Sequence, residues 1–175
     1  MISSKLRLVV FIAFLSGSLT ATSQQFYMGG PHITFTLPNP LWHEALTDSN
    51  MKISMYRTVF KREAVEAANH VLVIPNIEIV TERTNASLDQ FSGLKQQAIK
   101  IKIDSNLYEK NGVLQLKDAK AYFGHYISNN VHYKICIIQF VNNGYGAQII
   151  MDCTQDIFDE VWVEFRYFAE SLKLE

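Results

Sequence analysis

The chain has 175 residues, of which 48% are hydrophobic and 19% charged, a composition that is typical of a globular protein and too apolar for a disordered one. Sixteen Lys and Arg residues nearly balance seventeen Asp and Glu residues, so the formal net charge is −1. A chain without excess positive charge does not attract phosphate backbones, and we therefore expect no nucleic-acid partner.

The first 23 residues have the pattern of a cleavable secretory signal peptide. Lys5 and Arg7 form a positive start, and residues 8–15 form an apolar run that is too short for a stable membrane-spanning helix. Ala21 and Ser23 place small side chains where a signal peptidase reads them, which predicts cleavage before residue 24. The alternative is an uncleaved membrane anchor.

The rest of the chain predicts one soluble domain in the periplasm or outside the cell. No later segment approaches the ~20 apolar residues that a membrane span needs. Residues 24–31 are short, polar and Gly-rich, which indicates a flexible lead-in. We expect a single domain over residues 32–175, the usual size for one hydrophobic core.

The first half of this domain alternates apolar and polar residues, the pattern of strands with one buried face. The predicted strands are 32–37, 41–46, 52–60 and 71–80, the last one interrupted by Pro75. The composition of residues 62–69 favours a helical turn.

A helix is expected next, capped by Asn85 or Ser87. Its predicted apolar stripe consists of Leu88, Phe91, Leu94, Ala98 and Ile99. Residues 101–117 show no clear pattern and stay unassigned.

The last part of the chain predicts a three-stranded antiparallel meander and a closing helix. The strands are 120–127, 131–141 and 147–153, separated by Asn-rich and Gly-rich turns that accept positive φ angles. Thr154 is the predicted N-cap of the helix. Its apolar face, which we expect to pack on the sheet, consists of Ile157, Phe158, Val161, Phe165, Phe168 and Leu172.

This order of elements resembles the fold shared by PsbP, Mog1 and the bacterial DcrB-like secreted proteins. The resemblance rests on Phe-Thr-Leu-Pro at 35–38 with Trp42, and on Phe-Ala-Glu-Ser-Leu at 168–172. It implies an α+β fold in which helices pack on an antiparallel sheet as an α/β/α sandwich. It also implies a protein that works by binding other proteins, and it supplies no catalytic residues to carry over.

The two cysteines, Cys136 and Cys153, lie on neighbouring strands of the predicted meander. If Gly144 and Tyr145 form the turn, the two thiols are directly opposite each other. If the turn is one residue earlier, the pairing shifts by two and both thiols still point to the same face. A cross-strand disulfide and two buried free thiols therefore both stay open, and either is structural.

No residue pattern predicts a catalytic, metal or cofactor site. His125 and His132 flank one hairpin turn and would be diagonal neighbours, but no third ligand stands at a spacing that zinc sites use. The acidic residues of the last helix are better explained as capping and solvated charges. The nucleophile pattern Gly-x-Ser-x-Gly is absent.

Tyr122, Tyr126 and Tyr133 share one face of the predicted meander and form a candidate binding face. A tyrosine has an apolar body and a polar tip, so such a face suits either a covering helix, which we favour, or a partner.

The sequence thus predicts an exported binding or accessory protein without enzymatic activity and with a protein partner. A small-ligand carrier, a secreted effector acting on a host protein and a hydrolase without a recognisable motif are the alternatives.

Overall fold

The structure is a computed structural model. It describes residues 24–50, 55–98, 101–106, 114, 116 and 118–175. The predicted signal peptide at residues 1–23 lies outside the described residues. No helix in the described part of the chain is long and apolar enough to cross a membrane.

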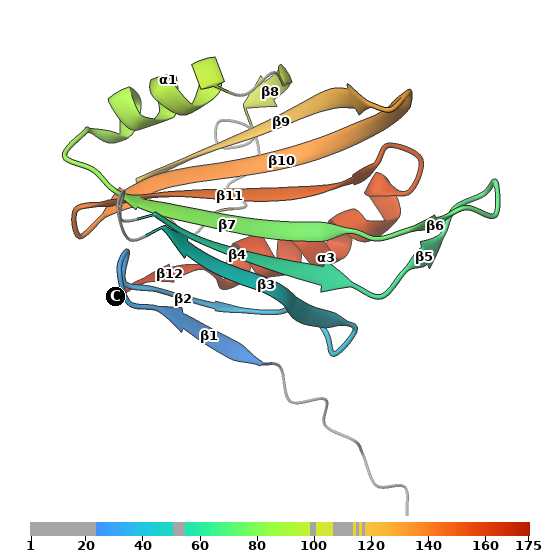
Figure 1. Ribbon diagram of the computed structural model, residues 1–175, viewed down its shortest axis with the longest axis horizontal. Helices are drawn as coiled ribbons and strands as arrows, with labels where there is room; N and C mark the ends of the chain where they lie inside the picture. The colour runs from blue at the N-terminus through green and yellow to red at the C-terminus, as the bar shows by residue number, and fades with distance from the viewer. Residues whose placement is uncertain (1–23, 51–54, 99–100, 107–113, 115, 117) are drawn as a thin grey trace, which may run out of the picture.

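A seven-stranded antiparallel sheet forms the centre of the molecule, in the order β3-β4-β7-β11-β10-β9-β8 (Figure 1). Its strands are β3 (Trp42–Asn50), β4 (Met55–Arg62), β7 (Asn76–Arg83), β8 (Lys102–Asn106), β9 (Ala119–Ser128), β10 (Val131–Asn142) and β11 (Tyr145–Thr154). Strand β8 falls in the stretch that the sequence pattern left unassigned, at the edge of the sheet beside β9.

The predicted meander is confirmed as β9, β10 and β11. Asn129 and Asn130 form the first turn with φ angles of 49° and 62°, and Asn143 and Gly144 form the second with 50° and 72°. Such positive angles suit Asn and Gly, so these four residues fix both turns and the register of the strands between them.

A smaller sheet lies beside the main one, in the order β1-β2-β12. Its strands are β1 (Gln25–Met28), β2 (Ile33–Thr36) and β12 (Lys173–Leu174). The expectation of a flexible lead-in at 24–31 is therefore wrong for β1. The Phe26 ring of β1 stacks on Phe35 of β2, with 5.4 Å between the ring centroids, and this contact holds β1 in place. The sequence did not predict β1 because a strand of four residues is too short to show a clear periodic pattern.

Helix α3 (Phe158–Ser171) packs its predicted apolar face on the sheet. All six residues predicted for this face are buried, and the Phe168 ring lies 5.3 Å from Phe35 of the small sheet. The predicted cap is wrong, because the N-cap is Ile157 and makes no side-chain hydrogen bond. The Thr154 hydroxyl instead donates to Asp156 in the turn before the helix.

Helix α1 (Leu88–Ala98) covers part of the other face, over β9 and β10. Ser87 caps it as predicted: the Gln90 N–H donates to Ser87 Oγ at 3.3 Å, and the Ser87 N–H donates to Gln90 Oε1 at 3.0 Å. The predicted stripe is only partly correct. Phe91 is buried against Gly146, where a Cβ atom would collide with its ring, but Leu94 is 65% exposed.

A two-stranded hairpin, β5 (Val65–Glu66) with β6 (Leu72–Val73), projects from the body of the molecule (Figure 1). It occupies much of the stretch at 62–69 for which the composition favoured a helical turn, so that prediction is wrong. Val65 and Val73 pair across the hairpin and both face the core, which outweighs the helix-forming composition. Pro75 separates β6 from β7, as the sequence predicted.

An ion pair fastens α3 to the base of this hairpin. Arg62 donates to both carboxylate oxygens of Glu164, and Trp42 Nε1 donates to Glu164 Oε2 at 2.6 Å. Burial alone raises the pKa of Glu164, but the hydrogen bonds from Arg62 and Trp42 outweigh it and hold the pKa below the usual value for glutamate.

The variant Glu164→Gln is expected to lose about 1–3 kcal/mol of unfolding free energy at neutral pH, because the partly buried charge of Arg62 then has no partner. The carboxylate stabilises the fold above the ordinary glutamate pKa of about 4.3, and this contribution is lost as the pH falls through the lower pKa of the folded state. Urea denaturation over a pH series measures both effects.

The matched control is Glu170→Gln, which removes a more exposed carboxylate that pairs with Arg166 on the same helix. This variant is expected to change stability by less than about 0.5 kcal/mol. Equal losses in the two variants would contradict the assigned role of Glu164.

Candidate functional site

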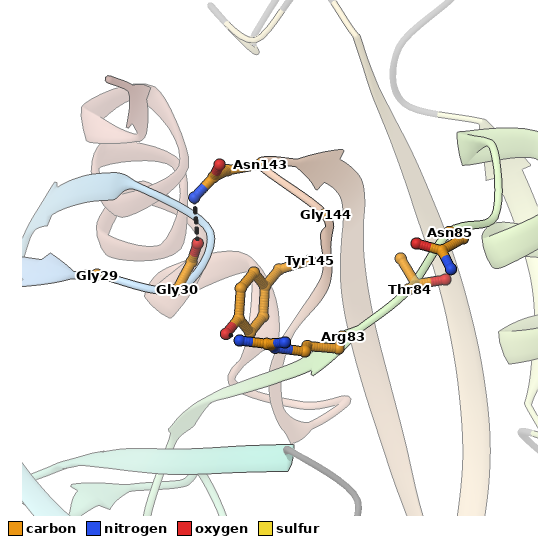
Figure 2. A pocket seen from close by; sticks show the side chains of 8 residues that line it. All are labelled: Gly29, Gly30, Arg83, Thr84, Asn85, Asn143, Gly144 and Tyr145. Atoms are coloured by element: carbon orange, nitrogen blue, oxygen red, sulfur yellow. Dashed lines mark hydrogen bonds between the residues drawn. The ribbon is translucent and has the colours of Figure 1, made fainter.

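Three chain segments meet at one end of the sheet and line an open pocket of about 790 Å³, which we call the loop-end pocket (Figure 2). They are the β1–β2 turn, the β10–β11 turn, and the segment that leads from β7 into α1. The residues that line it are Gly29, Gly30, Arg83, Thr84, Asn85, Asn143, Gly144 and Tyr145.

Hydrogen bonds between these segments hold the loop-end pocket in shape. Asn143 Nδ2 donates to the Gly30 carbonyl at 3.1 Å, and Asn142 Nδ2 donates to the Pro31 carbonyl at 2.9 Å. The Thr84 N–H donates to the Gly144 carbonyl at 2.9 Å. The pocket is thus preformed, because each of its walls is tied to a neighbouring wall.

Arg83 and Tyr145 stand side by side on the floor of this pocket, at paired positions of β7 and β11 (Figure 2). Arg83 Nε donates to the Tyr145 hydroxyl at 3.1 Å, and the guanidinium carbon lies 5.7 Å from the centroid of the Tyr145 ring. The hydrogen bond to Tyr145 raises the pKa of Arg83. Tyr145 therefore orients a permanent positive charge, and nothing in the sequence pattern pointed to this pair.

The predicted tyrosine face divides into two parts. Tyr122 is buried beneath α1, where its hydroxyl hydrogen-bonds to Ser92 Oγ at 2.9 Å. Tyr126 and Tyr133 are half-buried further along the sheet and stack on each other, with centroids 4.8 Å apart and planes 5° apart. Helix α1 thus covers Tyr122, and the other two tyrosines form a separate aromatic pair.

Asp152 lies next to the aromatic pair and forms a hydrogen bond with one of its hydroxyl groups. The Tyr126 hydroxyl donates to Asp152 Oδ2 at 2.6 Å. Burial raises the pKa of both groups, and the hydrogen bond from Tyr126 opposes that rise for the Asp152 carboxyl. A buried carboxylate with this donor is a structural polar contact of the sheet.

The variant Tyr126→Phe is expected to lower the free energy of unfolding by about 1–3 kcal/mol at neutral pH, because Asp152 loses its donor. The loss should shrink at lower pH, where Asp152 becomes protonated and is no longer a buried charge. Tyr133→Phe keeps the stacked ring and is the control. If both variants unfold alike in urea, the Tyr126–Asp152 bond does not stabilise the fold.

Cys136 and Cys153 are both buried and free. The turn is Asn143-Gly144, the second of the two registers considered, so Cys136 pairs with Met151 and Cys153 pairs with Lys134. The thiols share a face but are diagonal neighbours, and the cross-strand disulfide is not formed. Burial raises the pKa of both thiols, for Cys153 to about 12, so neither is a reactive thiolate.

Both cysteines should therefore resist alkylation in the native protein and react fully once the unreduced protein is denatured. Intact-mass measurement counts the added groups in each state. Two unreacted cysteines in the denatured, unreduced protein would reveal a disulfide and contradict the free thiols.

His125 and His132 line a groove of about 360 Å³ at the opposite end of the meander, together with Asp104, Lys134 and Asp159. His125 Nδ1 lies 2.9 Å from Asp104 Oδ2, and Lys134 Nζ lies 2.8 Å from Asp159 Oδ1. Within the described residues no three His, Cys, Asp or Glu side chains converge as a metal site would require.

The projecting hairpin presents three apolar side chains to solvent, a second feature that the sequence did not predict. Val71, Leu72 and Ile74 are 53%, 67% and 49% exposed. Leu41, also exposed, accepts a backbone hydrogen bond from Glu63 at the base of the hairpin. We call the hairpin over residues 65–74 the β5–β6 arm.

Solved structures of a similar fold come from three bacteria. A protein of Bacteroides thetaiotaomicron has a TM-score of 0.51 at 10% identity, over 87% of this chain and 48% of that one, so the chain spans about half its length. LpqN of Mycobacterium tuberculosis, described as involved in cell envelope biogenesis, has a TM-score of 0.50 at 13% identity, over 86% and 89% of the two chains. The PsbP protein of Synechocystis, CyanoP, has a TM-score of 0.49 at 12% identity. The match covers 94% of this chain and 99% of CyanoP.

The likeness is one of fold. The predicted α+β class, with a meander followed by a C-terminal helix, is confirmed, and the Bacteroides protein and LpqN share this fold at low sequence identity. No family model and no curated protein sequence matches the chain.

Proposed function

We propose that this protein is an exported accessory protein without enzymatic activity, which binds a protein partner in the cell envelope or outside the cell. The observation that carries this proposal is the β5–β6 arm. Large apolar side chains gathered on a projecting element are typical of surfaces that a partner covers. The signal-like pattern of residues 1–23 supports export.

The β5–β6 arm is built to present its apolar side chains rather than to bury them. Leu72 and Ile74 alternate with Val73, so they lie on the outer side of the hairpin while Val73 faces the core. Backbone hydrogen bonds between Ala67 and Val71, and between His70 and Ala67, close its tip at 2.9 Å each. Since the arm is already ordered, little conformational entropy is lost on binding.

The fold adds indirect support. LpqN, which has the same fold, is described as involved in cell envelope biogenesis. That description belongs to LpqN, and an envelope role for this chain is part of the proposal. At the base of the β5–β6 arm, Glu164 accepts hydrogen bonds from Trp42 and Arg62, and these bonds hold the base of the arm against α3.

The proposal predicts that Leu72→Asp abolishes capture of the partner. The tagged chain is mixed with envelope and culture-medium fractions of its host, cross-linked, and the captured proteins are quantified by mass spectrometry. Capture of the partner should fall at least about tenfold in this variant, as it does when a central apolar anchor is removed. Leu72 is largely exposed, so the variant should unfold at the same temperature as the parent.

Leu94→Asp is the matched control, because Leu94 has nearly the same exposure but lies on α1, away from the β5–β6 arm. The partner should be captured equally by the parent and by this control. Ile74→Asp should repeat the loss. If the arm variants capture the same proteins as the control does, the arm is not the binding surface.

A further inference from the structure

Arg83 differs from every other arginine that the structure describes. Arg57, Arg62 and Arg166 each form an ion pair with a glutamate. Arg83 has no carboxylate partner among the described residues, and the groups that affect its pKa are the Tyr145 and Tyr56 hydroxyls. The hydrogen-bond partner of Arg83 is thus a hydroxyl, and no carboxylate pairs with its charge within the described part of the chain.

Arg83 is a solvent-exposed side chain that contacts Tyr145 at the edge of the pocket. Its Nε is occupied by the Tyr145 hydroxyl and its guanidinium lies against the Tyr145 ring, which leaves the two Nη groups as donors. The Tyr145 ring packs closely on Gly30, where a Cβ atom would lie only 3.1 Å from it. The contacts with Tyr145 therefore orient the guanidinium.

The rest of the loop-end pocket is polar and carries no acidic side chain. Its other side chains are a hydroxyl at Thr84 and amides at Asn85 and Asn143 (Figure 2). The nearest glutamate in the sequence, Glu82, points away from it, since it pairs with Lys95 of α1 at 2.9 Å. The charge of the pocket lining is thus +1 at neutral pH.

We propose that the loop-end pocket binds a carboxylate, with the Arg83 Nη groups as its charged donors and the Asn85 amide as a neutral one. A guanidinium pairs with a carboxylate through two parallel hydrogen bonds, and a single positive charge matches a single negative one. The carboxylate belongs either to a small organic acid or to a peptide. This site lies at the other end of the sheet from the β5–β6 arm and does not depend on the proposed function.

Two-dimensional amide NMR of the full chain tests the proposal with three probes: acetate, a blocked Glu-Glu dipeptide and its Gln-Gln counterpart. The carboxylate probes should shift the amide signals of Gly30 and Gly144 in a saturable way, and the Gln-Gln dipeptide should not. Binding by the acetate probe as tight as by the Glu-Glu dipeptide identifies a small acid as sufficient. Tighter binding of the dipeptide identifies a peptide as the source.

Variants locate the site. Arg83→Gln should weaken carboxylate binding at least about tenfold, and Arg83→Lys should weaken it less, because the charge remains without the planar fork. Tyr145→Phe should also weaken binding, since Arg83 loses the hydroxyl that orients it. Arg166→Gln is the control and should bind as the parent does.

Equal affinity of the parent and Arg83→Gln would overturn the proposal, as would equal shifts from the Glu-Glu and Gln-Gln dipeptides. Inorganic phosphate that binds more tightly than either carboxylate would overturn the assigned ligand class. Leu72→Asp should bind carboxylates normally, so a failure here is distinguishable from a failure of the β5–β6 arm.

Discussion

The packing of α3 against the sheets is the contact on which the rest of the molecule depends. Phe158, Phe165 and Phe168 are almost completely buried along one side of this helix, and Phe168 reaches Phe35 of the small sheet. Burial of such large rings supplies the main stabilising free energy of a domain of this size. The helix therefore joins the large sheet and the small sheet into one core.

Glu164 of α3 adds specific hydrogen bonds to this apolar packing. Its carboxylate accepts hydrogen bonds from Trp42 and Arg62, which lie at the start of β3 and the end of β4. The end of β4 leads directly into the β5–β6 arm, so this ion pair ties the base of the arm to the helix. The two proposed binding sites lie at the ends of this scaffold, the arm at one end and the loop-end pocket at the other.

Strong local patterns made much of the fold predictable. The apolar spacing of α3 and the Asn and Gly residues of the two meander turns are short-range signals, and both predictions were confirmed. Strands β1 and β5 were missed because both are too short to show a clear periodic pattern, whereas β6 lies within the strand predicted at 71–80. The N-cap of α3 was missed because its cap makes no side-chain hydrogen bond.

The candidate sites were less predictable than the fold. Arg83 and Tyr145 are 62 residues apart and meet only through the register of β7 with β11, so neither has a local motif. The relation of Cys136 to Cys153 likewise depended on which residues form the turn. The predicted grouping of the three tyrosines on one face follows the strand register, but α1 packs on Tyr122 alone of the three.

The central claim is that the β5–β6 arm meets a protein partner after export, and site-specific photocross-linking in living cells of the host tests it most directly. A photoreactive amino acid at position 72 should give one cross-linked protein outside the cytoplasm, whereas the same group at position 94 should give none. Equal cross-linking from both positions, or adducts with cytoplasmic proteins only, would contradict the account.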